Sequence, residues 1–340
     1  MRMFRAFTYA SLLATMALVS ACYDTTAPRV PASFDARQAL ATVDPLAAVR
    51  EQGIFDSFHG GLSLFEAAIG SGTSPLGSGI SLAGSRVALQ RGLASAALVG
   101  TDEIPIAFRG KTLIYDPAVN AYVPDLAATG APEAGVRLVL YAWGDIGLPS
   151  FPLARIGYAD IAPVAAETPD LVEVVIVRDT PHTVISDFVV SHHSDAGGNS
   201  FGIEGSATDG TTTVSVTVEG TDSGPAGQRH IVYDSRLSVA ALGISSREQL
   251  VLDQATASEG GTLELSYGGH MFTEESVGPG AELRFDGQRY ASVVPASQGG
   301  AVQYLKPDGT SLTAQEVTDL NTLFERVILA HFFWIDLAVS

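Results

Sequence analysis

The sequence has one cysteine, Cys22, and two lysines, Lys111 and Lys306, among its 340 residues. A single cysteine excludes an intramolecular disulfide, a cysteine-rich zinc site and a four-cysteine iron–sulfur cluster within one chain. Charged residues make up only 16% of the chain, whereas hydrophobic residues make up 46%, which excludes a disordered protein and indicates a packed globular body. The stability of that body has to come from its hydrophobic core.

Positive charge is also scarce, and the formal net charge is -18. Such a surface repels phosphate backbones and anionic lipid headgroups, so we expect no nucleic-acid partner and no electrostatic docking on a membrane. The chain has no H-E-x-x-H motif, no complete EF-hand loop and no G-x-G-x-x-G after a strand. Gly110-Lys111-Thr112 resembles the end of a phosphate-binding loop, but Pro105 replaces the first glycine. We therefore expect no cofactor.

The N-terminus has the order of a secretory signal. Two arginines in Met1–Arg5 precede an apolar stretch, Ala6–Val19, which is too short for a permanent transmembrane helix. The next residues, Val19-Ser20-Ala21-Cys22, resemble the lipobox of bacterial lipoproteins. This resemblance implies cleavage between Ala21 and Cys22 and a lipid on the cysteine thiol. The alternative is an ordinary secreted protein that is cleaved after Ala21.

In lipoproteins two or three acyl chains give stable anchoring, because a single chain of myristoyl length binds a membrane only marginally. Position 23 is tyrosine rather than aspartate, and by resemblance to Gram-negative sorting signals this favours the outer membrane. We therefore expect a protein of the cell envelope that meets the membrane through its N-terminal lipid, on either the periplasmic or the surface face.

Three segments follow from these patterns: a signal peptide, 1–21, a lipidated tether, 22–45, and a globular domain, 46–340. The tether is indicated by three prolines among small and polar residues, Pro28, Pro31 and Pro45. Helical spacing of apolar residues predicts helices at the start of the globular domain. One expected apolar face contains Leu46, Val49, Ile54, Phe55 and Phe58.

From about residue 104 the pattern is typical of strands. The clearest prediction is a hairpin of Phe201–Ala207 and Thr212–Glu219 around Asp209-Gly210. In its second strand, valines at alternate positions predict a sheet with one covered and one wet face. Further strands are expected at 112–115, 121–123, 136–143, 154–161, 171–178, 183–190, 230–233, 249–253, 262–267, 283–285, 290–294 and 302–305.

The chain ends in a predicted helix with a capping box at Thr313 and Glu316, and its last part, Val327–Leu337, is expected to be deeply buried. The predicted fold is mainly β: a curved antiparallel sheet, half-barrel or sandwich-like, whose one face is covered by N-terminal helices and a C-terminal helix. This layout, over Ile104–Ser340, resembles the half-barrels of lipoprotein carriers and lipid-binding envelope lipoproteins. The resemblance implies an apolar ligand and assigns no binding residues.

One G-x-S-x-G motif, Gly198–Gly202, offers Ser200 as a candidate nucleophile. In α/β-hydrolases this motif connects a strand to a helix, but here a strand follows, so we expect a chance match. His192, His193 and Asp195 form the only dense group of candidate metal ligands. Adjacent histidines on an extended segment point to opposite sides, and the glycines that follow indicate a solvent loop, so we expect surface residues rather than a metal site.

Four other candidates are weaker. His331, on the apolar C-terminal helix, is expected to be a core histidine bonded to a carbonyl rather than a catalytic base. Asp56 and His59 are expected to form a helix-surface pair rather than a base and its partner. Trp143-Gly144-Asp145 and Asp187 mark possible pocket edges at strand ends.

The leading functional prediction is a non-enzymatic envelope lipoprotein that binds an apolar or lipidic ligand or scaffolds envelope proteins. Two alternatives remain open at this point: a hydrolase of envelope polymers or lipids with a nucleophile such as Ser200, and a structural or adhesive lipoprotein.

Overall fold

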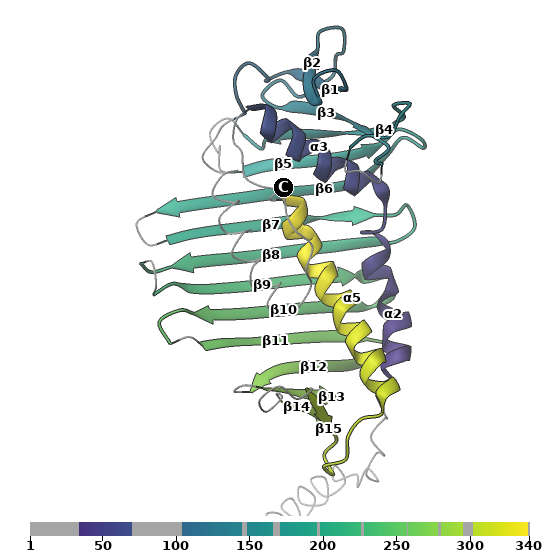
Figure 1. The fold of residues 1–340 in the computed structure, drawn as a ribbon, viewed down its shortest axis with the longest axis vertical. Coiled ribbons are helices and arrows are strands. Elements are labelled where there is room, and N and C mark those ends of the chain that lie inside the picture. Colours follow the sequence, from purple (N-terminus) through teal and green to yellow (C-terminus); the bar gives the residue numbers. More distant parts are fainter. Residues whose placement is uncertain are drawn as a thin grey trace, which may run out of the picture. The chain divides into compact units, whose positions relative to one another are not determined.

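The computed structural model describes residues 34–69, 104–144, 148–165, 171–195, 198–225, 228–256, 258–277, 280–294 and 302–338. In this part of the chain three α-helices accompany one sheet of fifteen strands (Figure 1). The mainly β fold with N-terminal helices and a C-terminal helix is therefore confirmed.

The elements have the following bounds. The helices are α2 (Ala36–Ala48), α3 (Gly53–Ile69), the 3-10 turn η1 (Ala240–Leu242) and α5 (Ala314–Ala338). The strands are β1 (Lys111–Asp116), β2 (Ala121–Asp125), β3 (Val136–Tyr141), β4 (Arg155–Pro163), β5 (Leu171–Arg178), β6 (Thr183–Asp195), β7 (Gly198–Thr208), β8 (Thr213–Ser223), β9 (His230–Val239), β10 (Ile244–Asp253), β11 (Ser258–Tyr267), β12 (His270–Val277), β13 (Gly280–Phe285), β14 (Gln288–Val294) and β15 (Gln303–Leu305).

The sheet is a meander from β3 to β15, in which each strand pairs antiparallel with the next. Only at one end does the order change, because β1 lies between β2 and β3 and runs parallel to β3. The described strands leave the sheet open, with β2 and β15 at its edges. All fifteen described strands belong to this single sheet.

The hairpin predicted from Asp209-Gly210 is confirmed as β7 and β8. The Asp209 carboxylate accepts hydrogen bonds from the amides of Thr211 and Thr212, at 2.7 Å each. Gly210 has a φ of 95°, a left-handed conformation that glycine adopts without strain. The residues of the turn itself thus determine this connection.

Helix α2 begins at Ala36, inside the segment that was predicted to be a tether, so the prediction that the globular part starts at residue 46 is wrong. The Asp35 side chain caps this helix by accepting hydrogen bonds from the amides of Arg37 and Gln38. Ala39 and Val43 are buried together with Leu46, at helical spacing. The prolines of the segment suggested an extended chain, but the aspartate cap and this apolar spacing decide in favour of a helix.

Helix α5 begins with the predicted capping box. The Thr313 amide donates to a Glu316 carboxylate oxygen at 2.7 Å, and the Glu316 amide donates to the Thr313 hydroxyl at 3.2 Å. The helix lies beside α2, and an ion pair of 2.8 Å joins Arg326 to Asp44 on that neighbour.

All three helices lie on the same face of the sheet, in front of the strands in Figure 1. Helix α3 contacts β2, β3 and β4, whereas α2 and α5 contact strands between β7 and β11. The buried valines of β8 point to this covered face, as their alternation predicts. Three aromatic contacts join α5 to the sheet: Phe332 stacks on Tyr233 at 5.9 Å, Trp334 meets Phe188 edge-on at 6.0 Å, and Phe324 lies 5.7 Å from Phe272. Within the described residues, no helix has the length and apolar character needed to cross a membrane.

Candidate functional site

The face of the sheet opposite the helices carries polar side chains in straight rows. Five serines lie side by side on five consecutive strands, because the strand register pairs each with the next: Ser206, Ser215, Ser238, Ser245 and Ser266. We call this set the serine row. Adjacent strands lie roughly 4.8 Å apart, so the row places hydroxyl groups at nearly constant intervals across the sheet.

A second row lies next to the serine row, two residues along each strand. The register pairs its members in the order Glu204, Thr217, Arg236, Arg247 and Glu264. We call this set the charged row. Both rows arise from polar residues at alternate positions of strands whose intervening residues are buried under the helices.

The arginines of the charged row are held by Asp234, which lies one row further along. The Arg247 guanidinium binds this carboxylate with two hydrogen bonds, from Nε at 3.1 Å and from Nη2 at 2.6 Å. Arg236 donates to it at 3.1 Å, and the Gln249 amide donates at the same distance. The two guanidinium groups are thereby held in place although both remain partly exposed.

The hydrogen bonds between Asp234 and the two arginines stabilise the charged forms of these side chains. Partial burial raises the pKa of Asp234, but hydrogen bonds from Arg247 and Arg236 outweigh that effect, and its pKa is lowered from the ordinary value. The hydrogen bond to Asp234 likewise raises the pKa of Arg247. Asp234 is therefore ionised at neutral pH, and it balances one of the two arginine charges.

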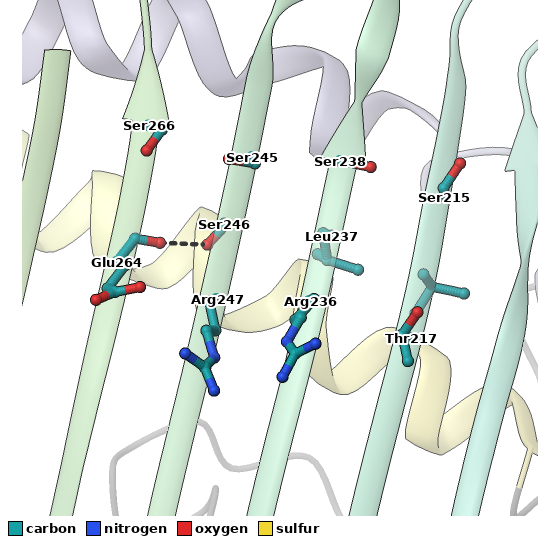
Figure 2. Close-up of a pocket in the computed structure, with 11 residues that line it drawn as sticks. Ser215, Thr217, Arg236, Leu237, Ser238, Ser245, Ser246, Arg247, Glu264 and Ser266 are labelled. Carbon is teal, nitrogen blue, oxygen red and sulfur yellow. Dashed lines mark hydrogen bonds between the residues drawn. The ribbon is translucent and has the colours of Figure 1, made fainter. Parts of the chain in front are cut away.

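A groove of about 390 Å³ lies over these two rows, lined by Ser215, Thr217, Arg236, Ser238, Ser245, Arg247, Glu264 and Ser266 together with the chain around Val216, Leu237 and Ser246. Figure 2 shows the serines along one side of this groove and the charged row along the other, with the helices behind the sheet. Its volume falls within the range of small-molecule sites, about 300–1,000 Å³. Its lining residues present hydroxyl, guanidinium and carboxylate groups, so the specific contacts it offers are hydrogen bonds.

No protein-family model, curated protein or solved structure matches this chain.

The structure separates the two adjacent histidines as their extended backbone predicts. His192 is buried on the covered face, with 4% of its surface exposed, whereas His193 is exposed on the open face. The prediction that these residues lie in a solvent loop is wrong, because β6 extends to Asp195 and pairs with β7 over this stretch. The side chain of Asp195 lies outside the described residues. In the described part of the chain, no three histidine, cysteine, aspartate or glutamate side chains form a group suited to a metal.

Ser200 lies within β7, opposite His193 on β6, so the register brings together two residues that the sequence analysis treated separately. This is not the strand-to-helix turn of an α/β-hydrolase. An acyl-transfer site also needs N–H groups that point at the developing oxyanion. Strand β7 pairs with β6 on one side and β8 on the other, which commits its backbone groups to the sheet. Ser200 is half-buried on a strand paired on both sides, a position that does not suit a nucleophile.

His331 lies in the core, as predicted, with none of its surface exposed. Its Nδ1 lies 2.7 Å from the Ser235 hydroxyl and its Nε2 lies 2.9 Å from the Ser246 hydroxyl. Ser246 donates its single proton to the carbonyl oxygen of Glu264 at 3.1 Å, so Ser246 accepts from Nε2–H and Ser235 donates to Nδ1. The predicted bond to a carbonyl is thus made indirectly, through Ser246.

Burial lowers the pKa of His331 to about 3, so the imidazole is neutral over the physiological range. A neutral ring that is held by two serines and shielded from solvent cannot exchange protons with a substrate. Its role is to tie α5 to β9 and β10.

The remaining candidates are not brought together. Asp56 is exposed and His59 is half-buried on α3. Asp187 was predicted at a strand end but lies within β6, opposite Ser206 on β7. Trp143 packs against Gly60, where a methyl group would overlap the indole ring. Asp145 lies outside the described residues, as does Cys22 with the whole signal and lipobox segment.

Sequence reasoning missed Arg236, Arg247, Asp234 and the serine row. Each strand shows its polar alternation in the sequence, and that signal predicts which residues share a face. It does not predict which residues of one strand stand beside those of the next, because a shift by two residues leaves the alternation unchanged.

Proposed function

We propose that the protein is a non-enzymatic lipoprotein of the bacterial cell envelope, which uses the open polar face of its sheet as a binding surface. The lipobox at Val19–Cys22 supports the envelope location and the lipid on Cys22. The observation that carries the binding function is the groove over the serine and charged rows, on the face that the described helices leave uncovered.

The packing of the covered face supports a partner on the open face over an apolar ligand beneath the helices. Large side chains of the helices, including Phe55, Phe58 and Trp334, have at most 2% of their surface exposed. These side chains pack on the covered face, the side on which a half-barrel carrier would hold an acyl chain. The open face instead offers hydroxyl, guanidinium and carboxylate groups that remain accessible.

The binding surface is tested by placing a photo-cross-linking amino acid, p-benzoylphenylalanine, at one position at a time in living cells of the producing bacterium. Position 217, at the edge of the groove, is compared with position 255, an exposed turn between β10 and β11. We expect an adduct of defined mass at position 217 and none at position 255. Equal labelling at the two positions, or none at either, would overturn the proposal.

Native mass spectrometry of the purified chain separates this proposal from the lipid-carrier alternative. A lipid mass that stays bound until the protein is denatured would support the carrier and contradict the open face as the functional surface.

The anchor is tested separately with Cys22→Ser. We expect the parent chain to incorporate an alkyne-labelled palmitate and to sediment with outer membranes. The variant should do neither, because it lacks the thiol that receives the lipid. Equal labelling of both chains would contradict the assignment of Cys22.

A further inference from the structure

The serine row offers hydrogen-bonding groups that the protein itself does not use. Among the described residues, the side-chain hydroxyls of Ser215, Ser238, Ser245 and Ser266 make no hydrogen bond within the chain. Each hydroxyl can donate one hydrogen bond and accept two. The four therefore present a line of groups that can both donate and accept hydrogen bonds, about 14 Å long from β8 to β11, along one side of the groove.

The second side of the groove provides planar polar groups that are fixed in position. Arg236 and Arg247 are oriented by Asp234, and the Glu264 side chain lies beside Arg247 in the charged row. Guanidinium groups donate hydrogen bonds and carboxylates accept them, so neighbouring hydroxyls of one ligand find both kinds of partner.

This region carries no excess of positive charge. Two arginines, Arg236 and Arg247, lie beside the carboxylates of Asp234 and Glu264. Glu204 and Glu219 add two further carboxylates to the same face, in a chain whose net charge is -18. A polyanion would be repelled by the acidic protein and would gain no net positive charge in the groove. A ligand without charge loses nothing from either effect.

We infer that this groove binds a neutral glycan, laid across strands β8 to β11 with its hydroxyl groups on the serine row and on the charged row. The inference rests on the proposed function of the open face and names its ligand class. The strand spacing is close to the length of one pyranose unit along a glycan, so successive sugars meet successive serines. The groove lining contains no aromatic residue, and binding therefore depends on several hydrogen bonds formed together.

The first experiment measures binding of the full chain, purified in a detergent without a sugar headgroup, to immobilised polysaccharides. The probes are two neutral polymers, dextran and laminarin, and one acidic polymer, polygalacturonate. We expect retention on at least one neutral polymer and none on polygalacturonate. Retention on the acidic polymer alone would overturn the inference of a neutral ligand.

The second experiment removes hydroxyls from the groove without adding bulk, in the double variant Ser238→Ala/Ser245→Ala. We expect at least a tenfold weaker retention on the neutral polymer. The matched control, Thr221→Ala/Ser292→Ala, removes two hydroxyls from the open face outside the groove and should retain the parent affinity. Equal weakening by both double variants would overturn the site, and unchanged circular dichroism excludes misfolding as the cause.

A third measurement uses a length series of neutral oligosaccharides as competitors. Inhibition should rise with chain length until the glycan spans the four serines and then level off. If no glycan binds while position 217 still gives its adduct in cells, the ligand class is wrong and the open face remains the binding surface. If neither occurs, both proposals are wrong.

Discussion

Glu248 is the side chain whose replacement tests the fold most directly. It lies on β10 and points to the covered face, with 4% of its surface exposed. Its register neighbours are Ser235 on β9 and Leu263 on β11, and Glu274 on β12 follows beyond Leu263. In the part of the chain that the structure describes, one of its carboxyl oxygens, Oε2, has no hydrogen-bond partner.

Burial raises the pKa of Glu248 to about 8, with a further contribution from the charge of Glu274, and burial raises the pKa of Glu274 to about 7. Both carboxyls are therefore protonated in the folded protein at mildly acidic pH, where they are already ionised in the unfolded chain. The folded state binds more protons, so stability is greatest at low pH and falls as pH rises toward the folded pKa values.

The magnitude follows from the size of the shift. Where the folded and unfolded states differ by one bound proton, the free energy of unfolding changes by about 1.4 kcal/mol for each pH unit. From about pH 5 to pH 8, Glu248 alone accounts for a loss of roughly 3 to 4 kcal/mol. This is a large share of the 5–15 kcal/mol that stabilises a typical domain, so it is measurable.

The perturbation is Glu248→Gln, which keeps the shape of the side chain and removes its titration. The assay is urea unfolding of variant and parent at several values between about pH 5 and pH 8. We expect the stability of the variant relative to the parent to rise by roughly 3 to 4 kcal/mol over this range. The control, Glu275→Gln, removes one carboxylate from the exposed side of β12.

A relative stability that stays constant with pH would refute the reasoning, because it would mean that Glu248 is solvated and that the helices do not cover β10. We also expect a difference in the free energy of unfolding between variant and parent that does not change with pH, since the amide of glutamine is itself a buried polar group.

Three further predictions use chemical or thermal unfolding. Burial lowers the pKa of His331 to about 3, so the parent should lose stability relative to His331→Asn by about 1.4 kcal/mol per pH unit as pH falls below 6.5; a difference that stays constant with pH would contradict this. In Gly220→Ala the new methyl group would overlap the ring of Phe201, with an expected cost of about 1–3 kcal/mol, whereas Gly260→Ala meets nothing; equal effects would exclude this packing. Trp334→Ala should cost about 3–5 kcal/mol, and a cost near zero would mean that α5 is not docked.

Several elements could be predicted because their causes are local. The Thr313/Glu316 capping box, the Asp209-Gly210 turn and the alternation of β8 each depend on residues a few positions apart. The extent of β6 could not be predicted, because the glycines that follow Asp195 are typical of a loop. Pairing with β7 and the close approach at Gly198, where a side chain would overlap the backbone of Asp222, explain why glycine stands there within a strand.

The sequence by itself determined the mainly β class and the division of each strand into an apolar and a polar side. These properties follow from the short-range spacing of apolar and polar residues, which does not depend on the neighbouring strands. Only the tertiary structure decided that the strands form one open sheet and that five serines stand in one row beside Arg236 and Arg247. Register is set jointly by every strand pair and by the helices that cover one face, so no single segment contains it.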